Sequence, residues 1–128
     1  MLVMNVQTPY LIGLSMVPGI GPARMRLLLD HFGQPEGAWQ ATYADLVDVG
    51  LDRKTADALV ETRRTLDLEG QLERIEKGGF RTLTWLDDAY PERLREVADS
   101  PPVLYVLVDD SYRRRLRHTG VVFHCVHA

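Results

Sequence analysis

The feature that most constrains the fold is a glycine-containing turn that recurs between short apolar segments. Gly19-Ile20-Gly21, here called the first hairpin, lies 31 residues before Gly50-Leu51-Asp52, the second hairpin. At the same offset the apolar pair Leu28-Leu29 aligns with Leu59-Val60. Apolar residues follow each turn at helical spacing. Each copy is therefore predicted to be a helix, a tight turn and a second helix.

Local signals predict where the helices of residues 1–79 begin and end. Thr8 is a plausible N-cap before Pro9, and Pro22 opens a helix that Gly33 ends. Thr42 and Asp52 are predicted N-caps of two later helices. Shorter helical segments are expected at residues 35–40 and 67–77. The sequence leaves open whether the helix after Asp52 and the helix over 67–77 are one kinked helix.

The pattern changes after Gly79. Residues 80–85 are rich in aromatic and β-branched residues and predict a strand. Pro91 opens a short helix, and the apolar run Val103–Val108 predicts a strand buried on both faces. Residues 112–118 are basic and predict a helix, and residues 121–126 predict a last strand. The expected architecture is a mainly α domain at residues 1–79 followed by an α/β segment at residues 80–128.

Composition narrows the class of protein. The 128 residues are 45% hydrophobic and 26% charged, as in an ordinary globular protein. Cys125 is the only cysteine, which excludes an intrachain disulfide and favours a cytoplasmic location. No apolar run approaches the roughly 20 residues that cross a bilayer, so no membrane contact is expected. The net charge is −3, and residues 1–107 alone carry −5. A surface that is cationic throughout, as many nucleic-acid-binding proteins have, is therefore excluded, and any such binding must be local.

The first hairpin has the chemistry of an anion site. Glycines two apart permit positive φ and leave backbone N–H groups uncovered. Those groups and the positive end of the following helix can converge on one phosphate. Ile20 is expected to point inward and fix the turn to its helices. The predicted phosphate-binding residues are Gly19, Ile20, Gly21, Ala23, Arg24 and Arg26.

Two alternatives stand beside this prediction. A Gly-hydrophobic-Gly segment between helices is also simply a tight corner, with no ligand. In the second hairpin Asp52 replaces the second glycine. As an N-cap, its carboxylate would occupy the N–H groups that a phosphate needs and would repel the phosphate. The second hairpin is therefore predicted to contact DNA poorly, despite Arg53 and Lys54 beside it.

The two hairpins together resemble a tandem helix-hairpin-helix module, a fold found in many DNA-associated proteins. A longer order of motifs over about residues 8–107 looks like the N-terminal part of the DprA/Smf family, the DNA-processing proteins of natural transformation. The motifs are Val17-Pro18-Gly19-Ile20-Gly21-Pro22-Ala23-Arg24, Leu27-Leu28, Phe32-Gly33, Gly78-Gly79-Phe80, Leu83-Thr84, Tyr90-Pro91 with Leu94, and Asp99-Ser100-Pro101-Pro102-Val103-Leu104-Tyr105-Val106.

The resemblance implies a SAM-like helical domain at residues 1–79 and the opening of a Rossmann-like domain from Phe80. It implies binding of single-stranded DNA during DNA uptake and recombination, loading of a RecA-type recombinase, and no enzyme activity. The family's Gly-[Ser/Thr]-Arg loop is not found after Val121–Val126, and the chain stops at Ala128. We therefore expect a truncated member with weak DNA binding of its own. The alternative is a module for protein interaction or self-association that does not bind DNA.

Other candidate groups favour structural roles. His118, His124, Cys125 and His127 match no standard zinc spacing, so no metal is predicted. The basic run at residues 113–117 is more typical of a solvated surface than of a phosphate site. The aromatic residues that could stack on bases have apolar neighbours, which favours core packing; they are Trp39, Trp85 and Tyr105. No catalytic constellation and no cofactor motif is present.

Overall fold

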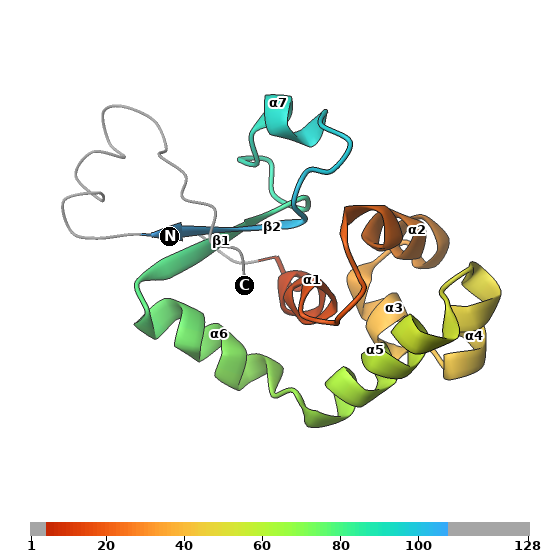
Figure 1. Cartoon of the computed structure of the whole chain (residues 1–128). Helices are drawn as coiled ribbons and strands as arrows, with labels where there is room; N and C mark the ends of the chain where they lie inside the picture. Colours follow the sequence, from red (N-terminus) through yellow and green to blue (C-terminus); the bar gives the residue numbers. More distant parts are fainter. Residues whose placement is uncertain (1–4, 108–128) are drawn as a thin grey trace.

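A computed structural model describes residues 5–107 and shows a helical body with a two-stranded sheet packed beside it (Figure 1). The element order is α1 (Thr8–Ser15), α2 (Pro22–Phe32), α3 (Pro35–Gln40), α4 (Tyr43–Val49), α5 (Arg53–Thr65), α6 (Leu68–Lys77), β1 (Phe80–Thr84), α7 (Glu92–Arg95) and β2 (Val103–Leu107). No helix in this range is long and apolar enough to cross a membrane.

Most helix boundaries follow the local signals. Thr42 Oγ1 accepts a hydrogen bond from the N–H of Asp45 at 3.1 Å, which caps α4. Gly33 ends α2 with a φ of 79°. The predicted cap at Thr8 is wrong, because Thr8 is the first residue of α1 and Gln7 holds the N-cap position. The Thr8 side chain is 1% exposed and packs inward, so burial takes precedence over capping.

Helices α5 and α6 are separate. Leu66 and Asp67, which lie between the two helices, have extended backbone with ψ of 126° and 104°. This break turns α6 back so that it lies against α1 and β1 (Figure 1). The segments before and after Asp67 are therefore two helices and not one kinked helix.

Helix α1 lies at the centre of the helical body. Its Leu11, Ile12 and Leu14 are at most 1% exposed. Around it pack α3, α5, α6 and β2, as Figure 1 shows for the elements that flank it. Buried residues of α2 to α5 and of the turns between the helices complete one core; among them are Met25, Leu28, Trp39, Leu46 and Leu59. Removing these side chains from water is the main source of stability in such a domain.

The two strands pair antiparallel, with Phe80 opposite Leu107 and Thr84 opposite Val103. Val103 and Leu104 are buried, whereas Leu107 is 44% exposed, so β2 is not buried along its whole length as the apolar run predicted. Val103 belongs to the same core as α1. Residues 80–107 therefore pack on the helical body. Within residues 5–107 the sheet contains only this antiparallel pair.

The aromatic residues serve packing, as predicted. Trp39 is 6% exposed. The Trp85 Nε1 donates to Ser100 Oγ at 3.0 Å. Tyr105 packs against the core, and this burial raises the pKa of its hydroxyl. None of the three is arranged as a free platform for bases.

Candidate functional site

The first hairpin is a tight turn that depends on Gly19. The N–H of Ile20 donates to the carbonyl of Val17 at 3.1 Å, with Pro18 and Gly19 between them. Gly19 has a φ of 94°, which side-chain-bearing residues rarely adopt. Proline at the second position and a positive-φ glycine at the third are the signature of a type II turn. The sequence Val-Pro-Gly-Ile thus encodes this corner locally.

Ile20 fastens the turn to the core, as predicted. Its side chain is 7% exposed and belongs to the main hydrophobic cluster. Its N–H is already used within the turn, donating to Val17. The expectation that the Ile20 N–H contributes to an anion site is therefore wrong, because the turn that presents the site consumes that donor.

Three other backbone donors remain at this end of α2. They belong to Gly21, Ala23 and Arg24, all exposed residues at the N-cap and first turn of the helix. Pro22 has no N–H. No group within residues 5–107 accepts a hydrogen bond from these three donors. A Cβ built on Gly21 would meet nothing within 4 Å, so the backbone there is open to a ligand.

Arg24 lies beside this open backbone. Its Nη1 donates to the Gly19 carbonyl at 2.8 Å. Its Nη2 lies 3.3 Å from Asp52 Oδ1, and both side chains are 47% exposed. The guanidinium therefore connects the first hairpin to the second while it stays accessible to solvent.

Arg26 is not part of the site, contrary to prediction. Its guanidinium donates to the carbonyl oxygens of Ala98 and Val97. It also lies 4.9 Å from the centre of the Trp85 ring. Arg26 thus holds the segment after α7 against α2, and both of its terminal nitrogens donate there.

The second hairpin forms a similar turn with a different pattern of hydrogen bonds. Gly50, at a φ of 117°, ends α4, and the N–H of Leu51 donates to the Leu46 carbonyl at 3.1 Å. The N–H of Gly50 donates to the Val47 carbonyl, which completes a Schellman motif. The Leu51 side chain is 3% exposed, the counterpart of Ile20. The repeat seen in the sequence is therefore a repeat in packing.

Asp52 occupies the helix end that follows this turn. Its Oδ2 accepts from the N–H of Thr55 at 3.2 Å, so α5 is capped as predicted. Hydrogen bonding from Thr55 is the main cause that lowers the pKa of the Asp52 carboxyl, and the positive charge of Arg24 adds to it. The carboxylate already fills the position where the second hairpin would hold an anion.

The two hairpins touch. A Cβ built on Gly19 would lie 2.8 Å from Thr55 Oγ1, at the start of α5. The first turn therefore packs directly on the N-terminal end of the second helix pair. Only a residue without a side chain fits between them.

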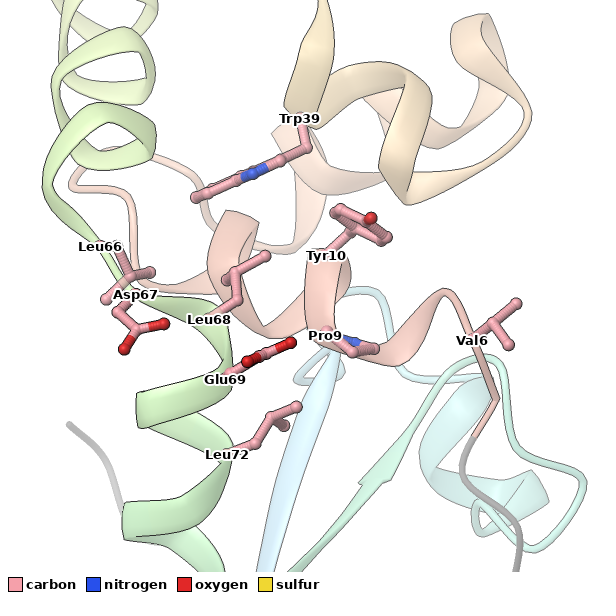
Figure 2. Close-up of a pocket in the computed structure, with 9 residues that line it drawn as sticks. All are labelled: Val6, Pro9, Tyr10, Trp39, Leu66, Asp67, Leu68, Glu69 and Leu72. Carbon is pink, nitrogen blue, oxygen red and sulfur yellow. The ribbon is translucent and has the colours of Figure 1, made fainter.

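A groove of about 520 Å³ lies elsewhere, between α1, α3 and the start of α6 (Figure 2). Apolar side chains such as Trp39, Leu68 and Leu72 line it, together with the carboxylates of Asp67 and Glu69. Among the described residues that line it there is no lysine or arginine. Its chemistry does not suit a phosphate, so the first hairpin stays the candidate anion site.

The remaining sequence candidates fall outside the described residues. They are the basic run at residues 113–117 and the group His118, His124, Cys125 and His127. Within residues 5–107 no group of three His, Cys, Asp or Glu side chains is placed to hold a metal ion.

The class of fold is defined by these two hairpins and their helices. Residues 11–65 match the family model of the SAM-like helix-hairpin-helix tandem. The chain is also 34% identical over 104 residues to Protein Smf of Synechocystis sp.. That match covers 80% of this chain, and with the tandem it assigns the chain to the DprA/Smf family.

A second relative shares a shorter segment. The UvrABC system protein C of Aromatoleum aromaticum is 52% identical over 44 residues, or 34% of this chain and 7% of the relative. The chain spans 26% of the length of Protein Smf. No solved structure matches the chain. The family therefore rests on Protein Smf and the tandem, and the second relative shows a shared segment alone.

Proposed function

We propose that this chain binds the phosphate backbone of DNA at the first hairpin, without enzymatic activity. The observation that carries the proposal is a set of three backbone donors, at Gly21, Ala23 and Arg24, that have no partner among residues 5–107 and lie next to an exposed guanidinium. A helix N-terminus carries roughly half a positive charge and directs its N–H groups at an anion. Backbone donors of this kind hold a phosphate without reading the base sequence.

The family supports a more specific role. In that role the chain takes part in DNA uptake, natural transformation and recombination as a DprA-type protein in the cytoplasm. Its ligand is single-stranded DNA, and a RecA-type recombinase is its partner. Residues from Phe80 onward then belong to a Rossmann-like domain, to which the described antiparallel pair β1 and β2 contributes the first strands. This role rests on the family assignment and on the order of motifs in the sequence.

The affinity of this chain for DNA is expected to be weak. Residues 1–107 carry a net charge of −5, and the Asp52 carboxylate blocks the second hairpin. One hairpin contacts about one or two phosphates, so the slope of log K against log salt is expected to be only about −1 to −2. A steep slope would indicate a larger cationic surface than the described residues contain.

The decisive test is Gly21→Asp, which gives the first hairpin the residue found in the second. Gly21 has an ordinary φ of −93° and open space around it, so the variant should fold. The new carboxylate would cap α2 and repel a phosphate. Hydrogen bonds to charged groups are worth about 1.5–3 kcal/mol, so DNA affinity should fall roughly tenfold or more.

The matched control is Gln34→Asp, which adds the same charge at the N-cap of α3. Binding of labelled single-stranded and duplex oligonucleotides would be followed by fluorescence anisotropy over a salt titration, with circular dichroism as the check on folding. Equal binding by the two variants, or binding that ignores salt, would refute the hairpin site. A DNA-inert oligomer in light scattering would instead favour an interaction module.

A further inference from the structure

The ion pair between Arg24 and Asp52 joins the open hairpin to the filled one. Arg24 Nη2 lies 3.3 Å from Asp52 Oδ1, and both side chains are about half exposed. The other carboxylate oxygen, Oδ2, accepts from the N–H of Thr55. One oxygen therefore caps α5 while the other faces the guanidinium beside the first hairpin.

The 31-residue repeat shows which residues of the two hairpins are equivalent. It aligns Gly21 with Asp52 and Arg24 with Thr55. In the second hairpin the N–H of Thr55 is bound to a carboxylate, whereas the equivalent N–H of Arg24 in the first hairpin has no partner within residues 5–107. The Asp52 carboxylate thus stands where a phosphate oxygen would stand in the second hairpin, and it holds the arginine of the first.

We propose that Asp52 is an intramolecular phosphate substitute that holds Arg24 in the free protein, and that a DNA phosphate bound at the first hairpin takes Arg24 from it. Asp52 therefore limits the affinity of the site. This inference rests on the proposed function, because it concerns the exchange of one anion for another at the same arginine.

The exchange of Asp52 for a phosphate at Arg24 costs little free energy. Half-exposed ion pairs contribute little to stability, so releasing Arg24 from Asp52 costs little. A phosphate can accept two parallel hydrogen bonds from a guanidinium, a stronger arrangement than the single contact to Oδ1. Because Oδ2 alone caps α5, Arg24 can leave without removing the cap.

The test is a double-mutant cycle of Asp52→Asn and Arg24→Gln, read as affinity for a labelled single-stranded oligonucleotide. Asparagine caps helices as well as aspartate, so Asp52→Asn keeps the fold and removes the charge. We expect Asp52→Asn to tighten binding about two- to fivefold, the range that an exposed ion pair spans, and to steepen the salt slope by about one.

Two controls separate this exchange from a general charge effect. Asp30→Asn removes the same charge from an exposed position near the end of α2. It should change affinity less than Asp52→Asn does. When Arg24 is already replaced by Gln, Asp52→Asn should raise the affinity for the oligonucleotide no more than Asp30→Asn does.

Two results would overturn the inference. One is an Asp52→Asn variant that binds the oligonucleotide no tighter than the Asp30→Asn variant. The other is a gain in affinity from Asp52→Asn that is equal in the wild type and in the Arg24→Gln variant. Both can occur while Gly21→Asp still weakens binding, in which case the hairpin site stands and only the exchange fails. If Gly21→Asp leaves binding unchanged, the proposed function itself fails.

Discussion

The two hairpins share a packing arrangement and differ in chemistry. Each has a positive-φ glycine, Gly19 or Gly50, followed by a buried aliphatic residue, Ile20 or Leu51. After that residue the first hairpin has a helix end with no hydrogen-bond acceptor among residues 5–107, whereas Asp52 caps the helix end of the second. The packing that builds the tandem and the capacity to hold an anion are therefore separate properties. A single position after the buried aliphatic residue, Gly21 or Asp52, distinguishes the two helix ends.

The hairpins also differ in how the chain enters the turn. The first uses a type II turn that Pro18 and Gly19 specify and that follows directly on Met16, the C-cap of α1. The second uses the end of α4 itself, with Gly50 as its left-handed residue. Two local solutions thus give one tertiary arrangement, and they should respond differently to substitution.

The largest difference is expected for alanine at the two glycines. Gly19→Ala should lower the free energy of unfolding by about 2–3 kcal/mol, from left-handed strain together with the displacement of Thr55. Gly50→Ala should lower it by only about 1–2 kcal/mol, since the nearest atom to its Cβ is Leu27 Cδ2 at an ordinary 3.6 Å. Urea unfolding of both variants measures the difference, and equal losses would show that the close approach to Thr55 is unimportant.

A smaller effect is expected for Pro18→Ala, which loosens the entry to the first hairpin alone. Proline restricts the unfolded chain at a position that suits its φ, so its loss should lower stability by about 0.4–1 kcal/mol. The same urea experiment measures it, with unchanged DNA binding as the accompanying expectation. A loss of binding at full stability would mean that Pro18 shapes the site as well as the turn.

The pH dependence of Asp52 tests the filled hairpin. Hydrogen bonding from Thr55 lowers the pKa of the folded carboxyl below its value in the unfolded chain, near 3.9. The stability that this carboxylate contributes is therefore fully present above about pH 4 and is lost as the pH falls through the lowered pKa. Relative to Asp52→Asn, the wild type should lose stability on acidification. A difference in unfolding midpoint that stays constant from about pH 6 down to about pH 2 would contradict the capping role.

Much of the fold follows from local sequence. Pro22, Gly33, Thr42 and Asp52 mark helix ends where the structure has them, because capping and φ restriction act within a few residues. The repeat likewise places both hairpins. The prediction failed at Thr8, where the competing influence was burial of the side chain in the core, which a capping signal does not register.

What the sequence by itself determined is the pair of turns, the helices they join and the contrast between Gly21 and Asp52, since each depends on backbone conformation or hydrogen bonding between near neighbours. Only the tertiary structure distinguished the two arginines near the first hairpin. Arg26 lies two residues from Arg24 but reaches a segment more than 70 residues away, whereas Arg24 meets Asp52 across the two hairpins. Side chains so close in sequence point in different directions on a helix, and their partners come from folding distant segments together.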